Sequence, residues 1–86
     1  MPYIKAEERT DEHLKFPENA GQLNWSLTRN IQAYIARQTH ERSLPAPNYA
    51  LYNEVMGVLA CMQQELYRRV IAPYEDQKAN ENGDVF

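Results

Sequence analysis

The sequence predicts an all-α protein built on an antiparallel hairpin of two amphipathic helices, at about residues 22–39 and 48–72. In both segments the apolar residues recur at spacings of three and four, which is the period of one helix face. No segment of strand length alternates between apolar and polar residues, which argues against a sheet. We also expect a short N-terminal helix and a C-terminal helical extension that is kinked at Pro73.

The N-terminal segment, residues 1–20, is polar and charged. Thr10 can cap a short helix here, because its hydroxyl can accept a hydrogen bond from a free backbone N–H of the first turn. Pro17 would end that helix.

The first long helix is expected to follow a break at residues 19–21. Its apolar face consists of Leu23, Leu27, Ile31, Tyr34 and Ile35. Pro45 and Pro47 prevent regular hydrogen bonding in the proline-rich connection 40–48, so the helix ends before it.

Asn48 is well placed to cap the second long helix. The apolar stripe of this helix runs over five turns and is formed by Tyr52, Val55, Met56, Leu59, Met62, Leu66 and Val70. Pro73 should end or kink the helix, because its ring clashes with the carbonyl four residues earlier. A further helical segment should close at Gly83 with a left-handed cap.

A chain of 86 residues predicts a single domain, 1–86, with a small core. Small cores usually need a supplement such as a disulfide, a metal or a partner subunit. Cys61 is the one cysteine, and His13 and His40 stand far apart, so we expect no disulfide, no metal site and no cofactor. Association with a second copy is the supplement that remains.

The unequal lengths of the two helices favour the same conclusion. At about 1.5 Å per residue, residues 24–39 span about 24 Å and residues 48–72 about 37 Å, which leaves the turns near residues 66–71 without a partner. The N-terminal segment is too polar to cover them alone. Gly57 and Cys61 form a patch of small residues that another helix could approach. The expected oligomer interface therefore comprises Gly57, Cys61, Leu66 and Val70.

Charge and apolar content narrow the partners and the location. A free cysteine and the lack of a leader favour a cytoplasmic setting, and no run reaches the ~20 apolar residues that span a bilayer. The net charge of −3 argues against nucleic acid as a partner. The middle of the chain is mildly basic and both ends are acidic, which favours an electrostatic match between segments or between copies.

No residue pattern predicts catalysis. Cys61 lies beside the apolar stripe and is expected to be a buried, inert thiol. His13 and His40 are expected at the surface. The sequence has no nucleophile elbow, phosphate loop or nucleotide fingerprint, so we expect no enzyme.

Arginines with aromatic neighbours give a candidate ligand site, because this combination can hold a phosphate and stack a base. The residues are Trp25, Arg29, Tyr67, Arg68 and Arg69. In an antiparallel hairpin the two groups could meet and form a pocket. The competing interpretation is that these arginines pair with Glu65, Glu75, Asp76 or the acidic tail of a neighbouring chain.

Several blocks of the sequence resemble a family of short uncharacterised proteins from bacteriophage and bacterial genomes. They are Met1-Pro2-Tyr3-Ile4, Leu23-Asn24-Trp25, Tyr52–Leu59 with Cys61, Glu65–Arg69, and Pro73–Asp76 with Glu81–Val85. Trp25 stands where the pattern has tyrosine, and Ala60 where it has an acidic residue. The resemblance implies a phage or prophage setting and no catalytic or binding residue.

Together these observations predict a non-enzymatic interaction or assembly protein that acts as a homo-oligomer and binds a host or phage protein in the host cytoplasm. The alternative is a protein that sequesters a small nucleotide-derived signal in an arginine and aromatic pocket between subunits. Direct binding of nucleic acid by residues 21–48 is the least favoured, because the chain is acidic and has no dense stripe of lysine and arginine.

Overall fold

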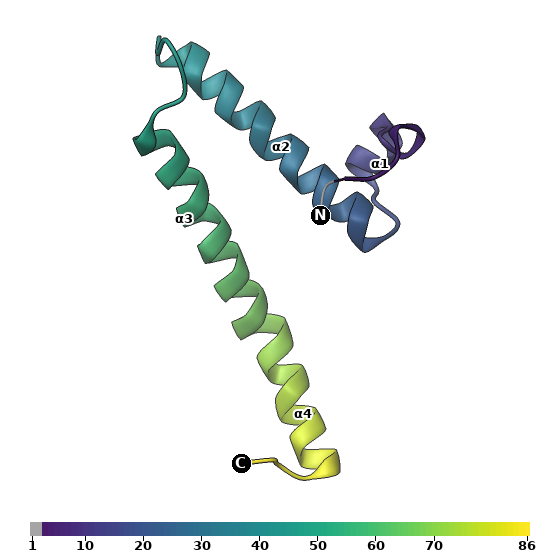
Figure 1. Ribbon diagram of the computed structural model, residues 1–86. Helices are drawn as coiled ribbons and strands as arrows, with labels where there is room; N and C mark the ends of the chain where they lie inside the picture. The colour runs from purple at the N-terminus through teal and green to yellow at the C-terminus, as the bar shows by residue number, and fades with distance from the viewer. Residues whose placement is uncertain (1–2) are drawn as a thin grey trace. The chain divides into compact units, whose positions relative to one another are not determined.

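The computed structural model describes residues 3–86 (Figure 1). Met1 and Pro2, which belong to the start of the resemblance, lie outside the described residues. The elements are η1 (Ala6–Glu8), α1 (Asp11–Lys15), α2 (Ala20–Glu41), α3 (Tyr49–Leu66), η2 (Tyr67–Ile71) and α4 (Ala72–Asn82). No strand occurs in residues 3–86, so the all-α prediction is confirmed.

Internal contacts divide the chain into two compact units, Met1–Tyr52 (unit 1) and Asn53–Phe86 (unit 2). The division falls inside the continuous helix α3. The antiparallel packing of the two long helices and the single domain both stay predictions.

Side-chain caps begin the helices of unit 1. The Thr10 hydroxyl accepts a hydrogen bond from the His13 N–H at 3.1 Å, as predicted for α1. The Asn48 side chain likewise accepts from the Leu51 N–H at 3.0 Å at the start of α3. The break expected at residues 19–21 was wrong, because the Asn19 side chain accepts from the Gln22 N–H at 2.8 Å and caps α2 there.

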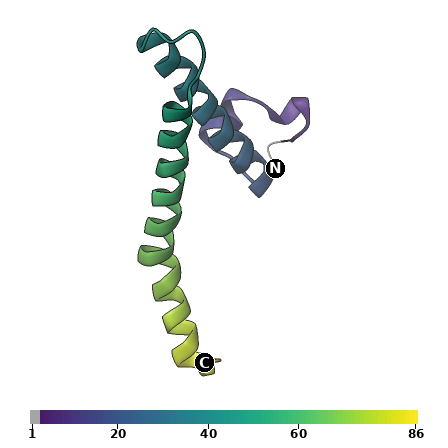
Figure 2. The same ribbon diagram turned by 60° about the vertical axis from the view of Figure 1, so that its left-hand side comes forward.

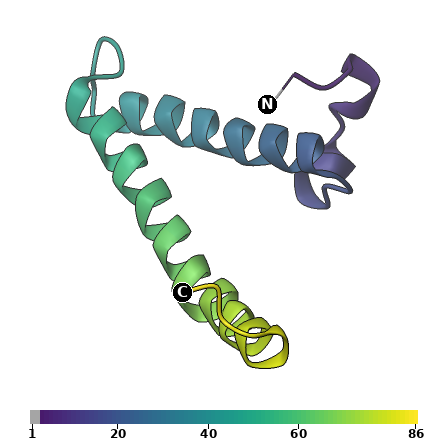
Figure 3. The same cartoon turned by 60° about the horizontal axis from the view of Figure 1, so that its bottom comes forward.

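The N-terminal segment packs on the polar face of α2, and Figures 2 and 3 both show it beside the first turns of this helix. Gln22 and Ser26 are buried on this face, and the Ser26 hydroxyl donates a hydrogen bond to the Leu14 carbonyl. Leu27 lies five residues after Gln22, about 140° round the helix at ~3.6 residues per turn. Unit 1 therefore leaves much of the apolar face of α2 open, and Leu23 and Leu27 are 48% and 44% exposed.

The apolar core is small. Among residues 3–86 the one buried hydrophobic side chain is Leu51, in the first turn of α3. The Asn48 cap fixes the backbone of Leu51 in that turn, because the Asn48 side chain accepts a hydrogen bond from the Leu51 N–H.

Unit 2 is a helix that continues through Pro73, so the predicted extension is present. The irregularity expected at Pro73 takes the form of the π-helical turn η2, directly before Ala72. The Ala72 N–H donates to the carbonyl of Tyr67, five residues earlier. This wider turn provides room for a proline ring that would otherwise clash with the Arg69 carbonyl.

Gly83 ends α4 with a φ of 87°, and its N–H donates to the Ala79 carbonyl at 2.8 Å. The positive φ agrees with the predicted glycine cap. Its ψ of 142° differs from a left-handed helical residue and leads the chain away in an extended conformation. Within residues 3–86, no helix combines the length and the apolar character needed to cross a bilayer.

Candidate functional site

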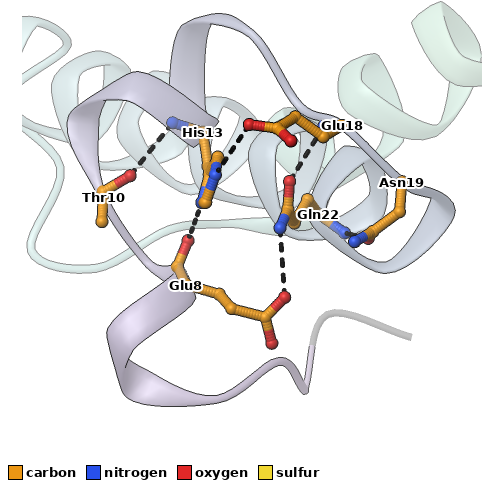
Figure 4. Close-up of polar contacts among 6 residues, drawn as sticks. All are labelled: Glu8, Thr10, His13, Glu18, Asn19 and Gln22. Carbon is orange, nitrogen blue, oxygen red and sulfur yellow. Dashed lines mark hydrogen bonds and ion pairs between the residues drawn. The ribbon is translucent and has the colours of Figure 1, made fainter.

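A network of polar side chains attaches the N-terminal segment to α2 (Figure 4). Its centre is the carboxamide of Gln22, which is 5% exposed. This carboxamide donates to the Glu8 carboxylate at 3.1 Å and accepts from the Glu18 N–H at 2.9 Å. One side chain of α2 therefore holds two points of the preceding chain.

His13, which was predicted to be a surface residue, is partly buried and belongs to the same network. Its side chain is 19% exposed. The Nδ1 atom donates to the Glu8 carbonyl at 2.7 Å, and Nε2 lies 3.4 Å from the Glu18 carboxylate (Figure 4). Both contacts suit a doubly protonated ring.

The network shifts two pKa values in opposite directions. The hydrogen bond to the Glu8 carbonyl, followed by the Glu18 carboxylate, raises the pKa of His13. The hydrogen bond from Gln22, followed by the one from the Lys5 N–H, lowers the pKa of Glu8. Each partner thus stabilises the charged form of these side chains.

Beside this network, unit 1 contains a groove of about 310 Å³. Its lining residues are Tyr3, Ile4, Arg9, Trp25, Thr28, Arg29 and Gln32. Two of the predicted ligand residues, Trp25 and Arg29, therefore lie in one groove. They come from consecutive turns of α2, where a spacing of four places them on the same face.

The groove also contains residues that the sequence analysis missed. Arg9 lies between η1 and α1, and Tyr3 precedes both elements. Among residues 3–86, neither Arg9 nor Arg29 has an ion pair or a side-chain hydrogen bond. The polarity of the N-terminal segment is visible in the sequence. No periodic pattern, however, indicates that Arg9 lines the same groove as Trp25.

The second half of the predicted ligand site lies in unit 2 and is largely engaged there. The Arg68 guanidinium pairs with Glu65, as the competing interpretation expected. The Tyr67 hydroxyl donates to Glu75 at 2.6 Å, and this bond raises the pKa of Tyr67. Whether this group joins Trp25 and Arg29 in one pocket stays a prediction.

The contact between Tyr67 and Glu75 is a consequence of the π-helical turn. Seven residues make about two turns of an α-helix, so residues eight apart are normally out of line. A hydrogen bond that spans five residues takes up about one additional residue. The residue eight positions after Tyr67 therefore lies on the same face of the helix, two turns further along. This residue is Glu75, which is thereby within reach of the Tyr67 hydroxyl.

The predicted interface residues divide between two faces of the helix. Leu66 is nine residues after Gly57, or two and a half turns, so the two lie on opposite sides of α3. A Cβ atom added at Gly57 would have no described atom within 4 Å, apart from the backbone of its own helix and its chain neighbours. Cys61 is exposed, so its expected burial was wrong for this chain alone.

The described residues contain no cluster of three or more histidine, cysteine or acidic side chains that could hold a metal ion. A second hollow, of about 500 Å³, lies in unit 2 beside the C-terminal tail. It contains the acidic residues Glu75, Asp76 and Asp84 and offers Lys78 as its one cation. Lys78 lies 5.6 Å from the ring of Tyr74 and pairs with Glu81, so this hollow is a poor site for an anion.

No curated protein and no solved structure matches the chain. A family model described as "Domain of unknown function (DUF6899)" matches residues 1–85. The resemblance to a family of uncharacterised proteins is thereby confirmed, and the chain belongs to the DUF6899 family.

Proposed function

We propose that the protein is a non-enzymatic interaction protein that works as a homo-oligomer, assembled through the helix that runs from α3 into α4. The observation that carries this proposal is a row of apolar residues at the spacing of a coiled-coil seam. It comprises Tyr52, Val55, Leu59, Met62, Leu66, Val70 and Tyr74. The first five alternate spacings of three and four, as the a and d positions of a heptad do.

The π-helical turn keeps this seam continuous. In an uninterrupted α-helix the next seam positions after Leu66 would be Arg69 and Pro73. The additional residue in η2 moves the register by one, so that Val70 and Tyr74 take those places. The irregular turn thus places two apolar side chains at seam positions that a charged residue and a proline would otherwise occupy. This placement supports the interpretation of the seam as a contact surface.

From Val55 onward the seam lies in unit 2, which contains no helix other than the continuous α3, η2 and α4 to cover it. Met62, Leu66 and Val70 are 52%, 55% and 58% exposed. Complete burial of such side chains is worth about 1.5–3 kcal/mol each. Several of them in one row offer a strong driving force for association.

Chain length favours a second copy as the cover. The helical residues 49–82 span about 51 Å, whereas the 22 residues of α2 span about 33 Å. Even if α2 packed along the seam over its full length, about three turns would need another partner. Most soluble oligomers are built from identical chains, which favours a second copy as that partner.

The molecular mass in solution tests the proposal. We expect the wild-type protein to sediment as a multiple of 10.1 kDa, and Met62→Glu to raise its dissociation constant at least roughly tenfold, because a seam charge must be desolvated. Gln64→Glu is the matched control for the seam, since it adds the same charge on the opposite side of α3, the face that Gly57→Leu tests separately. A monomeric wild-type protein at high concentration would contradict the proposal, as would equal effects of the two variants.

Gly57→Leu tests the opposite face of the same helix. The added side chain meets open space in the isolated chain, so the fold should tolerate it. A change of mass with this variant would place a second contact at Gly57 and Cys61. An unchanged mass would confine the interface to the seam.

We further infer a phage or prophage setting, with a host or phage protein as the partner in the host cytoplasm. The resemblance of the Tyr52–Leu59 and Glu81–Val85 blocks to phage and bacterial sequences supports this inference. Affinity capture from phage-infected and uninfected cells, with Met62→Glu as the assembly-deficient control, is the test. A partner captured equally by both proteins would bind independently of assembly.

A second candidate function, sequestration of a small nucleotide-derived ligand, is favoured by the groove that brings Trp25 and Arg29 together. Calorimetry against a panel of linear and cyclic nucleotides tests it. No heat across the panel would remove this candidate and leave the assembly proposal untouched.

A further inference from the structure

We propose that the groove of unit 1 binds one small ligand that carries a phosphate close to a flat ring, as a mononucleotide does. This inference rests on the second candidate function and gives it a site and a ligand class. It differs from the pocket expected between subunits, because residues of one unit supply both the anion contacts and the ring contact.

Arg9 and Arg29 supply the anion contacts. Both arginines line the same groove, and the lining residues within 3–86 include no acidic residue. Some exposed cations elsewhere in the chain are paired, such as Arg37 with Glu41 at 3.0 Å and Arg68 with Glu65. A phosphate between two unpaired guanidiniums would relieve their repulsion and accept paired hydrogen bonds from each.

Trp25 supplies the ring contact. This residue lines the groove and is half-buried, so one part of it is held by the protein and another part is open. Every nucleobase has a π face, and stacking on an indole is favourable whatever the base. Tyr3 lies at the same groove and adds a second aromatic surface.

Two polar side chains complete the lining. Gln32 follows Trp25 by seven residues and lies on the same face of α2. Its carboxamide has no hydrogen-bond partner among residues 3–86, so it is free to read the edge of a ring. Thr28 donates its hydroxyl hydrogen to Asn24 at 3.2 Å and keeps lone pairs as acceptors.

The size of the groove suits one small ligand. Ligand pockets range from roughly 300 to 1,000 Å³, and the volume of about 310 Å³ lies at the lower limit. The expected ligand is therefore one base with one phosphate, rather than a peptide or a dinucleotide.

The polar network prepares the groove for binding. Arg9 directly follows Glu8, which the Gln22 carboxamide holds on α2 at 3.1 Å. The Arg9 N–H also donates to the Ala6 carbonyl at 3.1 Å. Because the backbone at Arg9 is fixed before a ligand arrives, little ordering has to accompany binding.

Fluorescence of Trp25, the one tryptophan of the chain, gives a direct assay. We expect titration with AMP to quench the emission of the wild-type protein with saturation. Ribose 5-phosphate has no aromatic base and adenosine has no phosphate, so each should bind at least roughly tenfold more weakly. Arg29→Ala and Arg9→Ala should each weaken AMP binding by about tenfold or more.

Arg37→Ala is the matched control, because it removes an exposed arginine from the same helix outside the groove. It should bind AMP like the wild-type protein. Equal weakening by Arg37→Ala and Arg29→Ala would overturn the inference in favour of a general charge effect. Binding that survives Arg9→Ala and Arg29→Ala but is lost in Arg68→Ala would overturn the groove and leave the second candidate function standing.

A wild-type protein that binds none of the probes would overturn both the groove and the second candidate function. Mass measurements on the same samples keep these results separate from the assembly proposal. Emission that changes on dilution of the protein and not on addition of AMP would also overturn the inference, because the groove would then be a contact between copies.

Discussion

Replacing Gln22 with alanine tests how the N-terminal segment is held on α2. The buried carboxamide donates to Glu8 and accepts from the Glu18 N–H, and alanine can do neither. Loss of the acceptor for this part-buried N–H costs about 1–3 kcal/mol. That is a large fraction of the roughly 4–13 kcal/mol expected for a chain of 86 residues at ~0.05–0.15 kcal/mol per residue.

Urea unfolding followed by Trp25 emission measures this loss, because the tryptophan lies in the same unit. With a slope of about 1–3 kcal/mol per molar urea, the midpoint should fall by on the order of 1 M. The protein concentration must be equal in all samples, because assembly raises apparent stability.

Gln22→Glu separates the two hydrogen bonds. A carboxylate can still accept from the Glu18 N–H, but it cannot donate to Glu8 and adds a like charge beside it. The variant should therefore be less stable than the wild-type protein at neutral pH and approach it in acid, where a protonated carboxyl can donate. An unchanged midpoint and emission in Gln22→Ala would refute this account of the attachment.

Three further predictions follow from the contacts. Because the pKa of His13 is raised above 6.5, its contribution to stability is full below about pH 6.5 and is lost as the pH rises through the raised pKa, so His13→Gln should flatten that part of the stability profile. Leu51→Ala should cost about 2–5 kcal/mol in urea unfolding, because it empties the one fully buried apolar position of residues 3–86, and a loss below 1 kcal/mol would contradict that role. The hydrogen bond to Glu75 raises the pKa of Tyr67 above 10.0, so Glu75→Ala should lower the pKa of one tyrosine in an absorbance titration, and an unchanged titration would contradict this bond.

Local patterns made much of the fold predictable. The Thr10 and Asn48 caps were confirmed, because a cap depends on a residue and the three that follow it. The two long helical segments followed from apolar spacing in the same way, with boundaries that differ by two residues at each end of α2. The glycine turn at Gly83 also followed from local conformational freedom.

The course of the helix at Pro73 shows where local reasoning reaches its limit. Proline predicts a disturbance of the helix, and the disturbance is present. Either an end or a kink would satisfy that requirement, and the chain instead inserts one residue in the turn Tyr67–Ile71. The inserted residue realigns Tyr67 with Glu75, which no spacing rule for a regular helix anticipates.

The candidate site depended on contacts between residues far apart in the sequence. Apolar periodicity indicates that a face of α2 needs cover, but it does not indicate what lies on the opposite, polar face. The tertiary structure places the N-terminal segment there, through hydrogen bonds from Gln22 to Glu8 and from Ser26 to the carbonyl of Leu14. Those bonds bring Arg9 to the groove beside Trp25, because a buried polar face requires polar partners that only the folded chain can supply.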